Sequence, residues 1–145
     1  MMNVERKVTR DGIKIHGSND YNGMRMSCNL AAKTLDMISE HVYPGVTTAE
    51  LDKICHDFII LNNATPATLG YRGYPKSSCI SLNHVVCHGI PSNKKLKNGD
   101  ILNIDITCIL DGWFGDSSRM YIAGKANRKS QRLIQVTHDA LMLGI

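Results

Sequence analysis

One dipeptide most constrains the fold of this chain. Asp111–Gly112 separates two strand-like runs, with "ILNIDITCIL" before it and "WFGDSSRMYIA" after it. Asp-Gly is favoured in the two-residue type I′ turns that join antiparallel strands, because both turn positions need a positive φ. The pattern therefore predicts a β-hairpin from Ile101 to Ala123.

This hairpin determines which residues face each other. A two-residue turn pairs Thr107 with Asp116 and Asp105 with Ser118. Side chains alternate between the two faces of a strand, so Asp105 and Asp116 become diagonal neighbours on one face, with Cβ atoms roughly 7 Å apart or less. A single bulge would turn Asp116 to the other face.

Two carboxylates at that distance on a mostly apolar hairpin repel each other. One of them could be protonated, a cation could lie between them, or the face could be solvated. A divalent metal ion suits carboxylate oxygens best among the cations, since hard cations prefer oxygen ligands. The spacing alone leaves these alternatives open.

Helical periodicity precedes the hairpin. A first helix is predicted from Asn22 to Val42, and its apolar stripe consists of Met24, Cys28, Ala31, Leu35, Ile38 and Val42. Thr47 and Glu50 have the spacing of a capping box, which starts a second helix that runs to about Asn62. The apolar side of this second helix consists of Leu51, Ile54, Cys55, Phe58 and Ile59.

The segment between the second helix and the hairpin is rich in turn residues. "LGYRGYPKSSC" reads as a loop because of its Gly and Pro content, and "SNKKLKNGD" reads as a polar surface loop. "CISLNHVVCHGIP" predicts two short strands that are joined by a turn at Asn83–His84.

A third helix follows the hairpin. It is predicted to begin near Asn127 or Ser130 and to continue to the last residue, Ile145. Its apolar side consists of Leu133, Thr137, Ala140, Leu141 and Ile145. Helices and antiparallel strands in separate stretches of the chain are typical of an α+β domain.

Composition excludes several classes of protein. The 145 residues suffice for one domain with a core, and 43% hydrophobic with 21% charged residues is ordinary for a globular chain. No apolar run approaches the ~18–20 residues of a transmembrane helix, and residues 1–17 lack the apolar region of a secretory signal. The five cysteines form no Cys-x-x-Cys pair, which favours reduced thiols over a disulfide framework.

Four motifs in order resemble the bacterial-type (type I) methionine aminopeptidases. They are "PGVTTAELDKIC", "GYRGYPKSSC", "SSCISLNHVVCHGIP" and "NGDILNIDITCILDGWFGD", and the resemblance runs from about Gly23 to Ile145. It implies the N-terminal half of a pita-bread fold, in which two related α/β halves surround a curved antiparallel sheet. It also implies a cytoplasmic enzyme that removes the initiator methionine from nascent proteins.

The resemblance implies a role for each motif residue. Two divalent metal ions (Co, Mn, Fe or Zn) would lie between the halves, with Asp105 bidentate on one ion and Asp116 bridging both. His88 would contact the substrate and the transition state. The pocket for the methionine side chain would be lined by Tyr71, Tyr74 and Cys79.

Other candidate residues have plainer interpretations. His84 in the predicted turn and His138 on the third helix are expected on the surface. Trp113 and Phe114 are expected to pack within the hairpin rather than to contact substrate.

The resemblance also implies more chain than is present. The family's other ligands, a histidine and two glutamates, come from its second half, so residues 1–145 are expected to be one incomplete peptidase domain. We expect weak metal binding, no peptidase activity and poor solubility from the 145 residues alone. The expected partner is the N-terminal methionine of nascent peptides; ribosome contact would fit that function and the net charge of +4, whereas membrane and specific nucleic-acid partners are not expected.

An alternative class is the non-catalytic pita-bread modules of ribosome- or nucleic-acid-associated proteins. Such modules tend to lose the metal aspartates, whereas this sequence has Asp105, Asp116 and His88. Proline-cleaving and creatine-hydrolysing relatives are a further alternative, and "YPKSSCISLNHVVCHGIP" favours the methionine enzymes over them.

Overall fold

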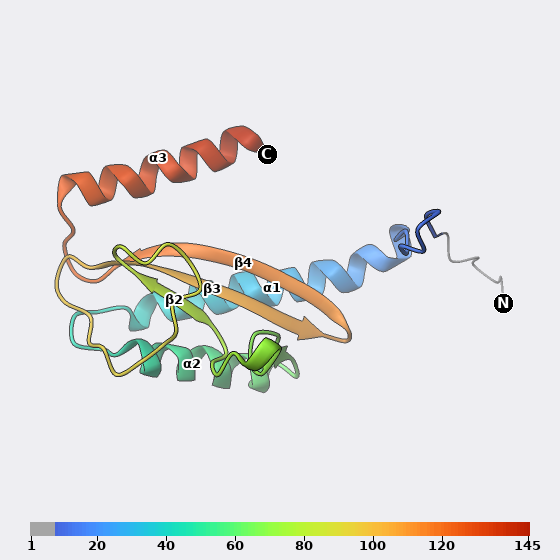
Figure 1. Cartoon of the computed structure of the whole chain (residues 1–145), viewed down its shortest axis with the longest axis horizontal. Helices are drawn as coiled ribbons and strands as arrows, with labels where there is room; N and C mark the ends of the chain where they lie inside the picture. Colours follow the sequence, from blue (N-terminus) through green and yellow to red (C-terminus); the bar gives the residue numbers. More distant parts are fainter. Residues whose placement is uncertain (1–7) are drawn as a thin grey trace.

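A computed structural model describes residues 8–145 and shows an α+β chain (Figure 1). Its elements in chain order are η1 Ser18–Asp20, α1 Tyr21–Ile38, η2 Ser39–His41, α2 Thr48–Leu61, β1 Thr65–Pro66, η3 Tyr71–Gly73, β2 Cys79–Leu82, β3 Ile101–Leu110, β4 Trp113–Ile122 and α3 Arg128–Gly144. The three predicted helices and the two long strands are therefore confirmed.

The sheet is antiparallel and has β3 at its centre. β4 pairs with β3 along its whole length, and the register places Thr107 opposite Asp116 and Asp105 opposite Ser118. β2 and β1 pair with successive parts of the other edge of β3. Asp111 and Gly112 both have positive φ, 51° and 81°, so the predicted turn and register are confirmed without a bulge.

Two helices cover one face of this sheet. α1 packs on β3 and β4, and α2 contacts α1, β1 and β2. The side chains of β3 that face these helices are buried: Leu102, Ile104, Ile106 and Cys108. The alternate residues of β3 are only half-buried: Asn103, Asp105, Thr107 and Ile109. The sheet thus has a core face and a polar face.

The predicted apolar stripe of α1 is wrong in its first turns. Met24 and Cys28 are exposed, and Ser27 and Leu30 are buried instead. The cause lies on β4, where a Cβ added to Gly115 would lie 2.2 Å from the carbonyl oxygen of Ser27. α1 therefore approaches the sheet closely at a small residue, and the Ser27 hydroxyl donates a hydrogen bond to the Trp113 carbonyl (2.8 Å).

α2 begins as predicted. The Thr47 hydroxyl accepts a hydrogen bond from the Glu50 backbone N–H (3.1 Å), and the Glu50 carboxylate accepts one from the Thr47 N–H (2.8 Å). These bonds satisfy two backbone donors that a helix start otherwise leaves free. The capping box is therefore confirmed.

The second short strand predicted in "CISLNHVVCHGIP" is wrong. β2 ends at Leu82, the turn at Asn83–His84 is present, and the residues from Val85 onward are irregular. His88 has a φ of 53°, which interrupts extended backbone, and Val86 is 92% exposed. Only Gly89 returns to β2, where its carbonyl accepts a hydrogen bond from the Ile80 N–H (2.8 Å).

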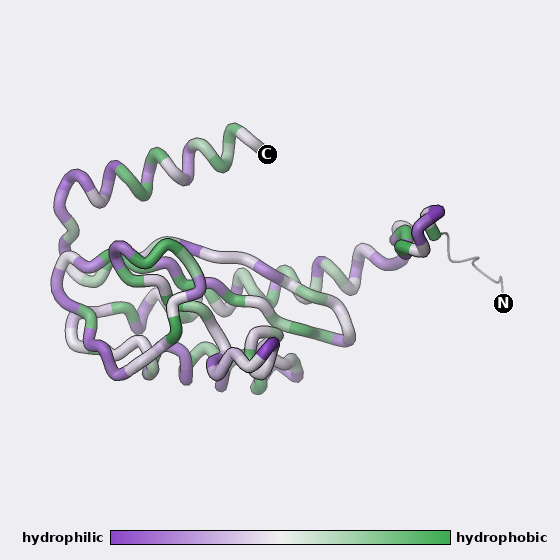
Figure 2. Tube along the Cα trace, viewed as in Figure 1, coloured by the Kyte–Doolittle hydropathy of each residue, from purple (hydrophilic) through white to green (hydrophobic). Residues whose placement is uncertain are grey.

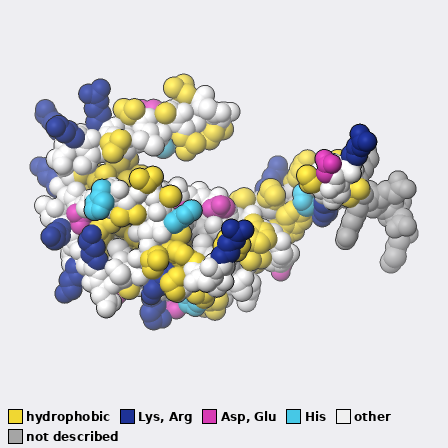
Figure 3. All heavy atoms as spheres, viewed as in Figure 1, with side chains coloured by type: hydrophobic (Ala, Val, Ile, Leu, Met, Phe, Trp, Pro, Cys, Tyr) yellow, Lys and Arg dark blue, Asp and Glu magenta, His cyan; other side chains and the backbone are white. Residues whose placement is uncertain are grey.

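α3 lies apart from the sheet in Figure 1. Its first turn is capped by Asn127, whose side chain accepts a hydrogen bond from the Ser130 N–H (3.0 Å), as the predicted start requires. No residue of α3 is buried. Figure 2 shows hydrophobic and hydrophilic residues alternating along it, and Figure 3 shows its hydrophobic side chains open to solvent. The expectation of poor solubility stays a prediction.

The cysteines agree with the reduced state expected from the sequence. All five are free thiols, of which Cys55, Cys79 and Cys108 are buried. Within residues 8–145, no helix has the length and apolar character that crossing a membrane requires. The expectation that no secretory leader is present rests on residues 1–17, of which residues 1–7 lie outside the described part.

Candidate metal and substrate site

The polar face of the sheet carries the two aspartates. Asp105 lies on β3 and Asp116 lies diagonally from it on β4, as the register requires. The Thr107 hydroxyl donates a hydrogen bond to the Asp116 carboxylate (3.1 Å), and Asn103 donates one to the Ser118 hydroxyl (3.3 Å). Polar side chains are thus hydrogen-bonded to one another on this face of the sheet, whereas the opposite face consists of buried core residues.

The two carboxylates influence each other. Partial burial raises the pKa of Asp105, the negative charge of Asp116 raises it further, and nearby His88 opposes the rise. Like charges and partial burial both disfavour the ionised form. A cation that contacted both carboxylates would remove this cost.

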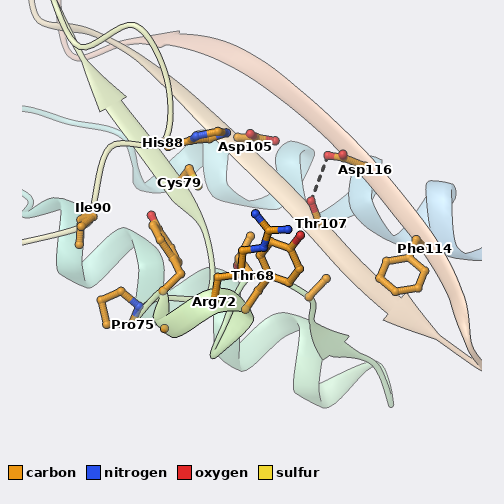
Figure 4. Close-up of a pocket in the computed structure, with 14 residues that line it drawn as sticks. Thr68, Arg72, Pro75, Cys79, His88, Ile90, Asp105, Thr107, Phe114 and Asp116 are labelled. Carbon is orange, nitrogen blue, oxygen red and sulfur yellow. Dashed lines mark hydrogen bonds between the residues drawn. The ribbon is translucent and has the colours of Figure 1, made fainter.

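A pocket of about 640 Å³ opens on this face (Figure 4). It is lined by Ala67, Thr68, Tyr71, Arg72, Gly73, Tyr74, Pro75, Cys79, His88, Ile90, Asp105, Thr107, Phe114 and Asp116. All six residues that the sequence assigned to metal or substrate therefore line one pocket. Phe114 also lines this pocket and is 58% exposed. Its expected role in hairpin packing rather than substrate contact stays a prediction.

His88 reaches the pocket from the irregular segment after β2. Figure 4 shows its ring beside Asp105. Its positive φ is uncommon for a residue with a Cβ. The next residue has no room for a side chain, because a Cβ on Gly89 would lie 2.2 Å from the Ile80 carbonyl oxygen. Close contact between this segment and β2 thus determines where His88 lies.

Tyr74 ties two walls of the pocket together. Its hydroxyl lies 3.0 Å from the Ser78 carbonyl oxygen and 3.1 Å from that of Gly89, and it donates its one proton between them. Burial raises the pKa of the Tyr74 phenol, so the donor keeps its proton. Tyr74 therefore holds the segment after His88 as well as lining the pocket.

The other two predicted pocket residues differ in exposure. Cys79 is buried opposite Asp105, and burial raises the pKa of its thiol, which keeps it neutral. Tyr71 is 64% exposed, and the Arg72 guanidinium lies 5.5 Å from the centre of its ring.

Asp52 supports the pocket from behind and was missed from sequence. It is buried on α2, and one carboxylate oxygen accepts hydrogen bonds from the Ser77 N–H (3.0 Å), the Ser78 N–H (2.9 Å) and the Ser78 hydroxyl (2.8 Å). These bonds fix the chain just before Cys79. The position of Asp52 beside Leu51, on the apolar side of the predicted helix, was the sequence feature that could have indicated a buried acid.

The remaining aromatic and histidine residues lie elsewhere. His84 and His138 are exposed, as expected. Trp113 packs against α1 at Gly23, and its ring also faces His16, with ring centres 5.0 Å apart.

Metal-ligating side chains are sparse around the two aspartates. Among residues 8–145, no group of three or more His, Cys, Asp or Glu side chains is arranged to hold a metal ion. Asp105 and Asp116 are therefore a pair of oxygen donors and not a complete cage.

The fold and this pair of acids point to a class of metal-dependent peptidases, and sequence comparison identifies it. A family model described as "Metallopeptidase family M24" matches residues 22–145, so the chain belongs to that family. Its relatives include methionine aminopeptidases from Rickettsia prowazekii, 61% identical over 133 residues, and from Salmonella typhimurium, 53% identical over 135 residues. Each match covers 92% of this chain and 51% of the relative.

Solved structures agree with the sequence relatives. The crystal structure of the Rickettsia prowazekii methionine aminopeptidase matches 91% of this chain and 53% of that one, with a TM-score of 0.90. A prolidase from Pyrococcus furiosus shares the fold, with a TM-score of 0.72 at 20% identity. The predicted pita-bread fold and family resemblance are confirmed, and the chain spans about half the length of the relatives it matches.

Proposed function

We propose that this chain contributes to a metal-dependent site that removes the initiator methionine from nascent proteins. The observation that carries the proposal is the convergence of Asp105, Asp116 and His88 on one pocket of about 640 Å³. The 61% identity to a methionine aminopeptidase supports the same reaction. Residues 1–145 would then be part of one peptidase domain.

The two aspartates would hold the divalent metal. Their oxygens are the donor type that such ions prefer. Burial and the charge of Asp116 raise the pKa of Asp105, a cost that a bound cation would offset. The family resemblance implies two ions, drawn from Co, Mn, Fe and Zn. A divalent ion acts as a Lewis acid and lowers the pKa of water towards neutrality.

His88 would act beside the metal and not as its ligand. An imidazole can donate a hydrogen bond to a carbonyl oxygen on which negative charge develops. The close contact of Gly89 with the Ile80 carbonyl positions the backbone from which the His88 ring extends. We assign it to substrate contact and transition-state stabilisation.

The pocket would take the methionine side chain. Tyr71 and Tyr74 offer aromatic surface, and the neutral Cys79 thiol offers a soft, polarisable contact. An unbranched thioether suits such walls, because sulfur interacts favourably with aromatic rings. The peptide bond that follows would then lie near His88 and the aspartates.

Calorimetric titration with Mn²⁺ tests the metal assignment. Asp116→Asn should weaken binding by about tenfold or more, since even an outer partner of a ligand is worth that much. Asp111→Asn in the same hairpin is the matched control, because it removes an equal charge outside the pocket and Asn tolerates a positive φ. Equal Mn²⁺ affinities for the two variants would overturn the assignment.

The 145 residues alone should bind metal weakly and should not cleave a Met-Ala peptide. The reason is that the described residues supply only two close carboxylates. Turnover by the purified chain, abolished by Asp116→Ala, would contradict this part while supporting the reaction itself.

The substrate would be the N-terminal methionine of nascent peptides, which places the reaction in the cytoplasm and makes the ribosome a natural neighbour. A non-catalytic binding module is the alternative function. The shared location of Asp105, Asp116 and His88 in one pocket argues against it.

A further inference from the structure

Arg72 occupies a backbone conformation that its side chain disfavours. It lies in η3 with φ 48° and ψ 34°, between Gly70 and Gly73, which also have positive φ. Glycine adopts this region freely, whereas a residue with a Cβ does so at a cost in free energy. The backbone of Arg72 is therefore strained, whereas that of the two glycines is not.

Arg72 lines the pocket and is exposed to solvent. It stacks on Tyr71, with 5.5 Å to the ring centre, and Figure 4 shows it extending from the loop towards the sheet. Among the ion pairs of residues 8–145, none includes Arg72. None of these ion pairs joins Arg72 to Asp105 or Asp116.

The pocket is consequently polarised. The sheet wall has two acids, Asp105 and Asp116, and the loop wall has Arg72, the one Lys or Arg among the pocket residues that the structure describes. A negative group would be repelled by the sheet wall and attracted by the loop wall. A guanidinium also matches the planar geometry of a carboxylate.

We propose that Arg72 binds a carboxylate of the peptide substrate downstream of its methionine. This inference rests on the proposed function, in which the amino end of the peptide lies at the aspartates. The carboxylate can be an acidic side chain or the C-terminus of a short peptide. Arg72 is then a specificity-determining residue that favours substrates with a negative charge near the cleaved bond.

Two peptide pairs separate these sources of carboxylate. Met-Ala-Glu-amide against Met-Ala-Gln-amide tests an acidic side chain, and Met-Ala-Ala as free acid against its amide tests a C-terminus. Binding to the chain with excess Mn²⁺ is measured by calorimetry, so no turnover is needed. We expect the charged member of at least one pair to bind about threefold to tenfold more tightly, and less so at high salt.

Variants tie this preference to Arg72. Arg72→Gln should abolish it, and Arg72→Lys should retain part, because a lysine keeps the charge without the planar fork. Lys76→Gln is the matched control, since it removes one nearby charge outside the pocket lining and should leave the preference intact. Arg72→Gly should also abolish the preference while keeping or raising the thermal midpoint, which a purely structural role for Arg72 would not produce.

The outcomes distinguish the two proposals. If the wild-type chain binds none of the four peptides, this inference is overturned, whereas the Mn²⁺ titration of Asp116→Asn still tests the proposed function on its own. If it binds them without preference for charge, or if Arg72→Gln keeps the preference, only the role of Arg72 is overturned.

Discussion

The two faces of β3 are built from alternate residues of one strand, yet they differ in almost every physical respect. Leu102, Ile104 and Ile106 point into the core beneath α1 and α2 and are nearly or completely inaccessible to solvent. Asp105 and Thr107, one position away, line an open pocket. Since neighbouring side chains point in opposite directions, a single strand can anchor the fold and present chemistry without either role displacing the other.

Truncation of the core face should produce the largest effect on stability. Ile104→Ala removes a fully buried side chain and should lower the free energy of unfolding by about 2–5 kcal/mol. Asn103→Ala on the other face is the control and should cost less than about 1 kcal/mol. Urea denaturation measures both, and similar losses would erase the proposed distinction between the faces.

Asp52 should be an exception to this distinction, because it is a polar residue near the pocket whose loss should lower the free energy of unfolding substantially. Asp52→Ala leaves the Ser77 and Ser78 N–H groups without their acceptor and should cost about 2–3 kcal/mol. The exposed Asp57 on the same helix forms a surface ion pair with Lys53, so Asp57→Ala should change stability by less than about 0.5 kcal/mol. If Asp52→Ala left the free energy of unfolding unchanged, the pocket wall would need no such hydrogen bonds.

The contact between α1 and the sheet should tolerate no added carbon. Gly115→Ala places a Cβ against the Ser27 carbonyl and should cost about 1–3 kcal/mol through displacement of α1. Gly17→Ala meets no atom within 4 Å and has a negative φ, so it should be neutral or mildly stabilising. The thermal midpoint of Gly115→Ala should therefore fall, whereas that of Gly17→Ala should stay constant or rise; a wild-type midpoint for Gly115→Ala would contradict the close contact.

The smallest expected effect depends on pH. Burial raises the pKa of Tyr121 from 10.0 to about 12. The folded state therefore holds this proton more tightly than the unfolded chain does. The contribution of Tyr121 to stability is constant below pH 10 and falls as pH rises from 10 towards 12. Tyr121→Phe should remove this part of the fall.

The same variant also loses the hydrogen bond from the Tyr121 hydroxyl to the Leu35 carbonyl (2.6 Å), which should cost about 0.5–1.5 kcal/mol at pH 7. The difference in stability between wild type and Tyr121→Phe should thus shrink at alkaline pH. A difference that is constant from pH 7 to 11 would contradict the raised pKa.

Local signals made most of the fold predictable from sequence. Asp111–Gly112 set both the hairpin and its register, and Thr47 with Glu50 set the start of α2. The errors came from contacts between distant segments. Nothing near Met24 in the sequence indicates that α1 contacts β4 closely at Ser27, opposite Gly115.

The candidate site shows the same division. The hairpin register alone brought Asp105 and Asp116 together, whereas the motif resemblance was needed to place His88 beside them. Neither the register nor the resemblance predicted Asp52 or Arg72. Asp52 forms hydrogen bonds to a loop some 25 positions away in the sequence. Arg72 has a left-handed backbone conformation that no local pattern indicated.

The strict alternation along β3 also limits how this segment can change over evolutionary time. Point substitutions can alter the pocket at one position and the core at the next independently. Insertion or deletion of one residue within the strand would exchange the two sets, turning Asp105 towards the helices and Ile104 towards the pocket. Descendants of this hairpin can therefore diversify by replacement of residues, while its length and phase are held constant.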